Sequence, residues 1–302
     1  MILELNMRKK FLVTGGAGFI GTTLVRHLID MGHDVAVFDN FSTGKRERLP
    51  DAAQVHVGDI LDTDALCTTA RGVDAVLHLA ALPSVQGSIE DPAGAHRVNV
   101  DGTLSVLEAV RTARVPRVVF TSSSAVYGDI ATFPTPETAP LSPKSPYALH
   151  KLIGEQYMQL WSELYNIETV SLRLYNVYGP NMDPNGAYAA VIARFLQLRA
   201  EEKPLTITGD GEQTRDFVHV ADVARAFLCA AESATVGSGE RVNIGSGVCA
   251  SINDVAHLVG GEVTYLPARV EPTRSEADIT NAHNILNWSP EISLQEGLAS
   301  LT

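Results

Sequence analysis

Tyr147 and Lys151 stand four residues apart in the stretch "YALHK", a spacing that places both side chains on one face of a helix. A phenol has an unperturbed pKa of roughly 10 and is a poor base near neutral pH. A neighbouring ammonium group stabilises the phenolate and lowers that pKa, so this pair could remove a proton from a hydroxyl group. Tyr and Lys often occur at this spacing by chance, so the interpretation depends on the surrounding sequence.

A second candidate is "TSSSAVYG" (121–128), in which three serines follow an apolar run and precede a tyrosine. Ser and Gly gather in loops for conformational reasons, so the stretch by itself favours a plain polar loop. Its place after an expected strand makes a chemical role worth testing against the rest of the chain.

Apolar runs alternate with helical segments through the first half of the chain. We expect strands at 10–14, 34–39, 54–59, 75–80, 117–122 and 169–174, and helices near 18–31, 62–71, 91–113 and 145–165. Continuous Val, Leu and Phe runs separated by helices indicate a parallel sheet covered on both faces. The expected class is therefore α/β with a doubly wound (Rossmann) sheet, whose ligands bind at the carboxyl ends of the strands.

The stretch "VTGGAGFIG" places Gly15, Gly18 and Gly21 directly after the first expected strand, at the opening of a helix. Glycines there allow a tight turn and close approach of the backbone to a pyrophosphate, which the helix N-terminus attracts. Asp39 closes the second expected strand, where an acid accepts hydrogen bonds from an adenosine ribose. A carboxylate repels a 2′-phosphate and so favours NAD over NADP, although the basic residues at 45–46 keep NADP open.

The pattern becomes irregular after about Tyr175, with shorter helices, Gly and Pro turns, and two late strand candidates, "LTITG" and "RVNIG". We expect an NAD-binding Rossmann domain over 1–175, with some later segments returning to it. A smaller α/β substrate-binding domain is expected over 176–302, laid over the edge of the sheet.

Composition excludes several classes of function. The chain has 302 residues, is 45% hydrophobic and carries a net charge of −12, which argues against a nucleic-acid partner. No apolar run approaches the roughly 20 residues of a membrane span. The N-terminal stretch lacks a secretory layout, so a cytoplasmic location is expected. Cys67, Cys229 and Cys249 lack ligand spacing, so neither a disulfide framework nor a metal site is expected.

Together these motifs resemble the extended short-chain dehydrogenase/reductase family, in its nucleoside-diphosphate-sugar epimerase branch. The resemblance runs through nearly the whole chain, in the order "TGGAGFIG", "DNFSTG", "GDI", "HLAA", "NVDGT", "SSSAVYG", "YALHK", "LRLYNVYGP", "GDGEQTRDFVHVADVARA" and "NIGSG". It implies a catalytic set of Ser123, Tyr147 and Lys151, in which Ser123 hydrogen-bonds the sugar hydroxyl while Tyr147 removes its proton.

The resemblance also assigns binding residues. It implies cofactor contacts at Gly15, Gly18, Phe19, Ile20, Gly21, Asp39, Asn40, Ser42, Thr43, Asp59, Ile60, Leu79, Ala80, Ala81, Asn99, Ser122, Tyr147 and Lys151. It implies substrate contacts at Ser84, Ser123, Ser124, Tyr147, Asn176, Ala190, Val191, Arg215, Arg269, Glu271 and Ser275. Arg269 and Glu271 stand where the family usually has Arg-Pro-Gly-Asp, so they are replacements in an altered stretch, "RVEPTRSEAD".

Two positions bear on the reaction and the sugar. Family dehydratases and decarboxylases carry acidic residues where this chain has Ser124 and Ala125. Without those carboxylates, the resemblance implies C4 epimerisation of a UDP-hexose through a transient 4-keto sugar and tightly bound NADH. Ser275 replaces a tyrosine found in members limited to glucose and galactose, so UDP-GlcNAc and UDP-GalNAc should fit as well.

Three further expectations complete this interpretation. One alternative is a UDP-glucuronate 4-epimerase or decarboxylase on the same fold. Another is a catalytically idle NAD-binding regulatory protein, which the retained Ser123, Tyr147 and Lys151 argue against. The resemblance also implies a homodimer formed through the helices near 91–113 and 145–165.

Overall fold

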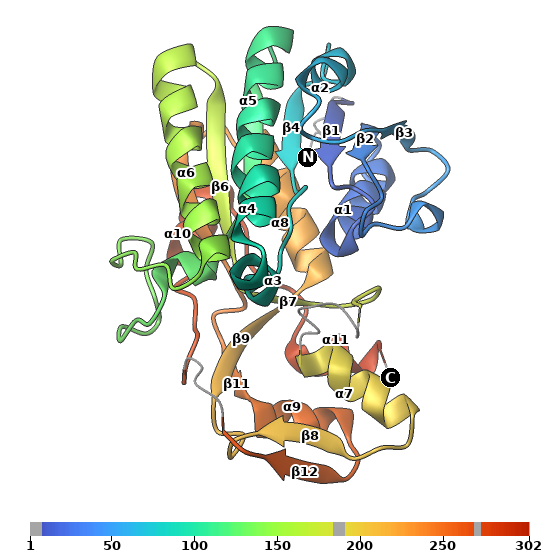
Figure 1. Cartoon of the computed structure of the whole chain (residues 1–302), viewed down its shortest axis with the longest axis vertical. Coiled ribbons are helices and arrows are strands. Elements are labelled where there is room, and N and C mark those ends of the chain that lie inside the picture. Colours follow the sequence, from blue (N-terminus) through green and yellow to red (C-terminus); the bar gives the residue numbers. More distant parts are fainter. Residues whose placement is uncertain (1–7, 184–190, 269–272, 302) are drawn as a thin grey trace, which may run out of the picture.

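A seven-stranded parallel sheet forms the centre of the computed structural model, which describes residues 8–183, 191–268 and 273–301 (Figure 1). Its strand order is β10-β6-β5-β4-β1-β2-β3. The strands are β1 (Lys10–Thr14), β2 (Asp34–Asp39), β3 (Gln54–Val57), β4 (Ala75–His78), β5 (Arg117–Ser123), β6 (Glu168–Leu174) and β10 (Ser238–Ile244). Every neighbouring pair is parallel, which confirms the expected doubly wound α/β class.

Helices cover both faces of the sheet because side chains alternate along each strand. Phe11 and Val13 of β1 face a core shared with α1 (Phe19–Asp30) and α8 (Val220–Glu232). Leu12 between them faces a second core. That second core is shared with α2 (Thr63–Thr69), α5 (Gly102–Ala113) and α6 (Pro146–Tyr165). The two helical layers hold the carboxyl ends of the strands in a fixed row.

The expected helix over 91–113 is divided into three parts. After α3 (Val85–Glu90), Pro92 opens the short helix α4 (Pro92–His96), which Asp91 caps by accepting a hydrogen bond from the Gly94 amide at 2.9 Å. A π-helical turn, Arg97–Asp101, then leads into α5. The Thr103 hydroxyl donates to the Asn99 carbonyl at 2.7 Å across this turn. The wider turn changes the direction in which Asn99 points relative to a continuous α-helix.

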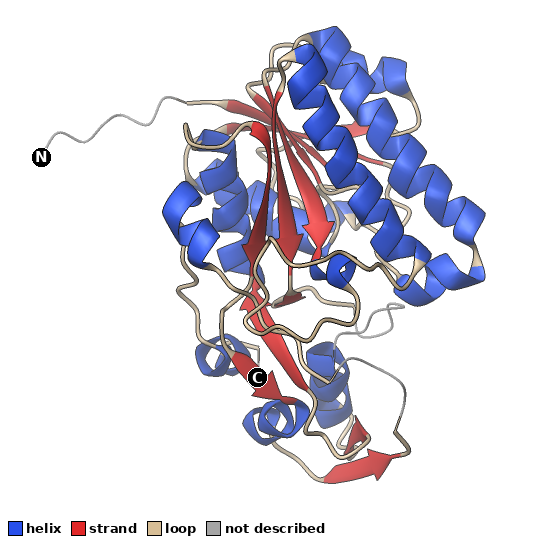
Figure 2. Cartoon of the chain, turned by 90° about the vertical axis from the view of Figure 1, so that its left-hand side faces the viewer, coloured by secondary structure: helices blue, strands red, loops and turns tan. Residues whose placement is uncertain are grey.

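A smaller lobe lies beyond the carboxyl ends of the sheet, and the arrowheads of the large sheet point toward it (Figure 2). It contains the three-stranded sheet β11-β9-β7 and the two-stranded sheet β12-β8. Its elements are β7 (Asn176–Tyr178), α7 (Val191–Ala200), β8 (Leu205–Thr208), β9 (Thr214–His219), β11 (Cys249–Ser251), α9 (Ile252–Val259), β12 (Val263–Leu266) and α11 (Leu294–Ala299). The helix α10 (Thr280–Leu286) packs instead against β10 and α8.

The late strand candidate "RVNIG" belongs to the large sheet, where β10 pairs in parallel with β6. The sequence places it in the irregular second half of the chain, from which some segments are expected to return to the Rossmann domain. Its Val242 and Ile244 are fully buried and join the core beneath α8. The sheet thus takes one edge strand from a segment more than sixty residues after β6.

Candidate active site

The glycine turn after β1 is packed too closely for a side chain at its first position. Gly15 has a φ of +70°, and a Cβ there would come within 2.6 Å of the Ala80 amide nitrogen. Gly18, which has no side chain to serve as a cap, occupies the N-cap position of α1. The amides of the first helical turn therefore remain for another acceptor, as a phosphate site requires.

Asp39 joins the loop after β2 to this glycine turn. Its carboxylate accepts the Ala17 amide at 2.9 Å and the Phe41 amide at 2.8 Å. Asn40 in turn donates to Asp59 at 3.1 Å, across the ends of β2 and β3. Three predicted cofactor residues from two loops are thus brought together. The predicted residues Ser42 and Thr43 follow them on the surface.

The loop after β4 is fixed by Asn99. The Asn99 side chain accepts the Leu82 amide at 2.7 Å and donates to the Leu82 carbonyl at 3.0 Å. These two bonds hold the end of the predicted cofactor segment Leu79, Ala80 and Ala81. The same loop presents Ser84, whose Oγ caps α3 by accepting the Gly87 amide at 2.8 Å. Asn99 is therefore used to shape the loop, and its side chain is 4% exposed.

His78 lies beneath this loop as a neutral side chain. Burial lowers its pKa to about 3. Thr103 donates its proton to the Asn99 carbonyl, so it must accept from His78 Nε2 at 3.1 Å. His78 Nδ1 then accepts from the Thr14 hydroxyl at 2.7 Å. This arrangement identifies His78 as a packed strand residue.

The predicted catalytic residues meet at the carboxyl end of β5. Ser123 is the last residue of β5, and its side chain hydrogen-bonds Tyr147 in the first turn of α6. Lys151 Nζ donates to the Thr121 carbonyl at 2.7 Å. The same nitrogen lies 5.9 Å from the centroid of the Tyr147 ring. Residues from a strand and a helix, far apart in the sequence, therefore share one small volume.

Burial dominates the pKa values of this cluster. It lowers the pKa of Lys151 to about 8, against the opposing attraction of Glu155. Burial also raises the pKa of Tyr147, and the hydrogen bond to Ser123 offsets this in part. The protein's own groups therefore do not produce the expected lowering of the Tyr147 pKa. The Lys151 ammonium is held by a backbone carbonyl and lies over the ring face, so it does not reverse the desolvation of the phenolate.

The three serines of the stretch take different positions. Ser122 is 1% exposed, and its hydroxyl donates to Glu155 at 2.5 Å. Its side chain thus faces the protein interior, and the contact of Ser122 with the cofactor stays a prediction. Ser124 begins a 3-10 turn, Ser124–Tyr127, and is partly exposed. The strand end therefore turns one serine inward and leaves Ser123 and Ser124 at the site.

In the smaller lobe, the segment that carries Ser275 is hydrogen-bonded to strand β9, which carries Arg215. Thr214, next to Arg215 on β9, accepts the Ser275 amide at 3.1 Å and donates its own amide to Thr273 at 2.9 Å. Asn176 on β7 donates to the Asp216 carbonyl at 3.2 Å. Val191 begins α7. The other three predicted substrate residues, Ala190, Arg269 and Glu271, lie outside the described residues.

Sequence reasoning missed Asp216, which shapes this part of the site. The side chain is fully buried and accepts the Ser246 amide at 2.5 Å, the Gly247 amide at 3.0 Å and the Ala277 amide at 3.0 Å. It therefore ties β9 to the loop after β10 and to the segment that carries Ser275. The available signal was an acid that directly precedes the short apolar run "FVHV" (217–220), because a carboxylate beside buried residues needs hydrogen-bond partners.

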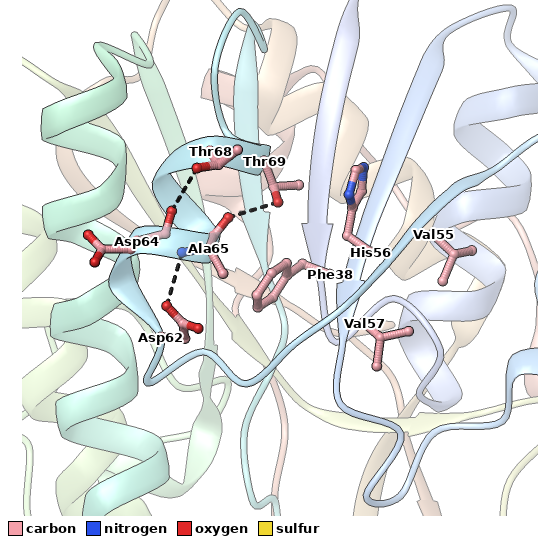
Figure 3. A pocket seen from close by; sticks show the side chains of 9 residues that line it. All are labelled: Phe38, Val55, His56, Val57, Asp62, Asp64, Ala65, Thr68 and Thr69. Atoms are coloured by element: carbon pink, nitrogen blue, oxygen red, sulfur yellow. Dashed lines mark hydrogen bonds between the residues drawn. The ribbon is translucent and has the colours of Figure 1, made fainter.

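The groove between β3 and α2 is a separate surface feature (Figure 3). Three of its polar side chains already serve α2: Asp62 accepts the Ala65 amide at 3.0 Å, and the hydroxyls of Thr68 and Thr69 donate to backbone carbonyls. It contains no predicted catalytic residue. Within the described ranges, no group of His, Cys, Asp and Glu could hold a metal ion. Likewise, no helix in the described part of the chain is long and apolar enough to cross a membrane.

Comparison with known proteins gives matches along nearly the whole chain. The model of the NAD dependent epimerase/dehydratase family matches residues 11–245. A putative UDP-glucose 4-epimerase of Methanocaldococcus jannaschii is 41% identical over 296 residues, covering 95% of this chain and 95% of the relative.

Solved structures agree in fold and differ in sugar. UDP-glucose 4-epimerase of Thermotoga maritima with UDP-glucose has a TM-score of 0.90 at 38% identity, covering 96% of both chains. UDP-N-acetylglucosamine 4-epimerase of Methanobrevibacter ruminantium with UDP-N-acetylmuramic acid has a TM-score of 0.91 at 35% identity, covering 97% of both. UDP-glucuronic acid 4-epimerase of Bacillus cereus with UDP-glucuronic acid and NAD has a TM-score of 0.87 at 34% identity, covering 96% of both. A UDP-N-acetyl-alpha-D-glucosaminuronate decarboxylase of Bacillus cytotoxicus is also 32% identical over 314 residues, covering 97% of this chain and 96% of the relative.

Proposed function

Because this chain belongs to the NAD-dependent epimerase/dehydratase family, we propose that it inverts C4 of a UDP-hexose. The chain is an NAD-dependent enzyme of the UDP-sugar 4-epimerase type. We propose UDP-glucose and UDP-galactose as one substrate pair, with UDP-GlcNAc and UDP-GalNAc as a second. The observation that carries the proposal is the cluster of Ser123, Tyr147 and Lys151 at the end of β5, with no acid at positions 124 and 125.

The residues at the carboxyl ends of β1 to β4 suit NAD. The tight turn at Gly15 and the α1 amides left by Gly18 fit a pyrophosphate, since a side chain at Gly15 would strike Ala80. We propose that Asp39, Asn40 and Asp59 surround the adenosine, with the loop at Leu79–Ala81 beside the nicotinamide ribose. When bound, NAD supplies a hydride acceptor that takes hydrogen from C4 and returns it to the opposite face.

The catalytic residues move the proton of the C4 hydroxyl. Tyr147 removes it as the C4–H bond breaks, and Ser123 holds the hydroxyl oxygen in line with the phenol. Lys151, anchored on the Thr121 carbonyl, supplies positive charge beside the developing phenolate. After the keto sugar has turned, Tyr147 returns the proton to the oxygen. The sugar gains and loses the same atoms, so no net oxidation results.

We propose that the smaller lobe, within residues 176–302, holds the UDP part of the substrate. Arg215 suits the oxygens of a diphosphate or of uracil, because a guanidinium offers several donors in a plane. Asn176 donates a hydrogen bond to the carbonyl of Asp216, the residue that follows Arg215, and so lies near that arginine. Ser275 hydrogen-bonds the same strand through its backbone and presents a small side chain. We therefore propose that the small side chain of Ser275 leaves space for an acetamido group at C2 of the sugar.

The direct experiment is to incubate the purified protein separately with UDP-glucose, UDP-GlcNAc and UDP-glucuronate, and to follow each by proton NMR without added NAD. We expect the C4 epimers of the first two to appear, with cofactor retained from expression. If the protein converted only UDP-glucuronate, its substrate would be a UDP-uronic acid, and the two proposed substrate pairs would be wrong. Release of carbon dioxide would identify a decarboxylase and contradict the proposal.

Substitution of Ser275 by tyrosine tests the choice of sugar. A phenol ring in place of a hydroxymethyl group fills the space proposed for the acetamido group. Ser275→Tyr should therefore lower kcat/KM for UDP-GlcNAc by about 100-fold and leave UDP-glucose within about threefold. Initial rates on the two substrates measure this ratio, and UDP-glucose serves as the internal control. An equal loss on both sugars would place Ser275 outside the pocket for the 2-substituent.

A homodimer through the helices near 91–113 and 145–165, which are α4, α5 and α6 in the structure, is a further part of the proposal. Leu149, Leu160 and Leu164 on α6 are 46%, 44% and 65% exposed, which is unusual for leucines aligned along one helix. The double substitution Leu160→Glu with Leu164→Glu should convert a dimer into a monomer in sedimentation equilibrium, because it buries two charges in the interface. Leu258→Glu, on α9, is the control. A monomeric wild-type protein would refute this dimer.

A further inference from the structure

A buried ion pair lies directly behind the catalytic side chains. Glu155 follows Lys151 by one turn on α6, and its side chain is 1% exposed. Its partner Arg173 lies on β6 and is 2% exposed. Arg173 is the register partner of Ser122 on β5, so the pair sits beneath the strand end that carries Ser123.

Glu155 accepts three hydrogen bonds from two strands. Arg173 donates from Nε at 2.8 Å and from Nη2 at 2.7 Å, a bidentate contact with both carboxylate oxygens. Ser122 Oγ donates to Oε1 at 2.5 Å. Arg241 on β10 approaches Oε2 at 3.9 Å. A single carboxylate on the catalytic helix thus holds the ends of β5 and β6 together.

Arg173 extends the contacts beyond the helix. Its Nη1 donates to the Tyr127 hydroxyl at 2.9 Å, and Tyr127 donates to Asn243 at 2.6 Å. Asn243 then donates to the Thr135 carbonyl at 2.9 Å and the Asp278 carbonyl at 3.2 Å. Asp278 lies three residues after Ser275. The network therefore connects the catalytic helix to the segment proposed to face the sugar.

Stability is a weak explanation for such a pair. Removing two charges from water is costly, and well-packed apolar residues of similar size often serve a core equally well or better. A fully satisfied buried network instead fixes the geometry of the groups that it joins. The network joins three elements: helix α6, which carries Lys151, the end of β5 at Ser122, and strand β10, which carries Asn243.

We propose that Glu155, clamped by Arg173, is a positioning residue of the catalytic site: it keeps Lys151 positively charged and fixes the end of β5. The proposal rests on the proposed function, since it assigns Lys151 a role in proton removal by Tyr147. It concerns residues that do not themselves touch the substrate.

The charges around Lys151 support this role. On its own helix the ionisable neighbours are Tyr147, His150 and Glu155, and on β4 it faces His78. Burial lowers the pKa values of both histidines, which favours their neutral forms. Glu155 raises the pKa of Lys151 against the desolvation that brings it to about 8. Beside Lys151, Glu155 is therefore the compensating negative charge.

The pH dependence follows from the sign of this interaction. The active form contains the Lys151 ammonium, so activity falls as pH rises through its pKa of about 8. Without the carboxylate, Lys151 loses its proton more easily. Glu155→Gln, which keeps the shape of the side chain, should therefore move the alkaline limb of kcat down by about one pH unit. A residue that only filled space would lower kcat at every pH and leave the limb in place.

Two variants serve as comparisons. Glu155→Asp keeps the charge and should leave the alkaline limb near the wild-type position, even if kcat falls. Glu163→Gln, on the same helix with an exposed side chain, should change neither property. Should Glu155→Gln fail to fold, the double variant Glu155→Gln with Arg173→Gln removes the unpaired cation. The alkaline limb should again move down, because Glu155 is the group that raises the pKa of Lys151.

A titration of 13Cε-labelled lysine by NMR reads the charge of Lys151 without catalysis, with Lys151→Met identifying its signal. We expect this resonance to titrate at lower pH in Glu155→Gln than in the wild type. An unchanged titration midpoint would overturn the proposal. Absence of epimerase activity in a protein whose Lys151 midpoint still shifts would count against the proposed function and leave this electrostatic role standing.

Discussion

Tyr147→Phe should lower kcat for epimerisation by about 1000-fold, because it removes the group proposed to take the C4 hydroxyl proton. Burial raises the pKa of this phenol in the protein itself, so the hydroxyl carries its proton near neutral pH. The backbone amide of Tyr147 donates to Ser88 Oγ at 3.0 Å, and this contact is unaffected by the substitution. KM should therefore change little. Coupled-enzyme assays at saturating UDP-glucose measure the loss.

Tyr157→Phe is the matched control on the same helix. The Tyr157 ring packs edge-on against Trp161, with centroids 5.5 Å apart, and lies two to three turns beyond Tyr147 on the helix. It should leave kcat unchanged. If Tyr147→Phe retained more than about a tenth of the wild-type kcat, another group would have to be the base, and the roles of Ser123 and Lys151 would need revision.

Gly15→Ala should abolish retention of NAD during purification and lower the free energy of unfolding. The added Cβ would lie 2.6 Å from the Ala80 amide nitrogen and 2.7 Å from its Cα, so the backbone after β4 must move. That backbone borders the proposed nicotinamide end, and the turn itself faces the pyrophosphate. Cofactor content after acid release and urea unfolding measure the two effects.

Gly72→Ala separates the steric effect from the effect of backbone conformation. Gly72 has the same φ of +70°, but a Cβ there would meet no atom within 4 Å. The strain of a left-handed conformation should cost about 1 kcal/mol in Gly72→Ala, with the full NAD content kept. Equal losses of stability and cofactor in the two variants would show that close packing against Ala80 does not matter.

Much of the fold was predictable because the signals are local. The strand ends at Thr14 and Asp39 and the helix that carries Tyr147 and Lys151 lie within a residue or two of the predicted bounds. The apolar runs and turn glycines that define them are neighbours in the sequence. The match to the family model over 11–245 confirms the resemblance drawn from the motifs.

The remainder depends on contacts between distant residues. The pairing of β10 with β6 joins Val242 to Leu172, and nothing near "RVNIG" identifies that partner. The π-helical turn at Asn99 depends on a carbonyl bond from Thr103 and on the backbone of Leu82. Local periodicity predicted one continuous helix instead.

In the candidate site, too, some features follow from local sequence signals and others from contacts between distant residues. Types and spacing singled out Tyr147 and Lys151, and the family resemblance added Ser123. The structure brings the three residues together. The inward turn of Ser122 follows from Glu155, thirty-three residues later, and sequence reasoning had no partner to assign to it. The direction of the Tyr147 pKa depends on burial by elements that only the folded chain supplies.

The most direct test of C4 epimerisation uses UDP-glucose labelled with deuterium at C4, incubated with the protein in ordinary water without added NAD. Proton and deuterium NMR then follow the label in the product. If hydride leaves C4 and returns within one site, the UDP-galactose formed should keep the deuterium at C4. A product carrying hydrogen from solvent at C4, or no UDP-galactose at all, would contradict the account.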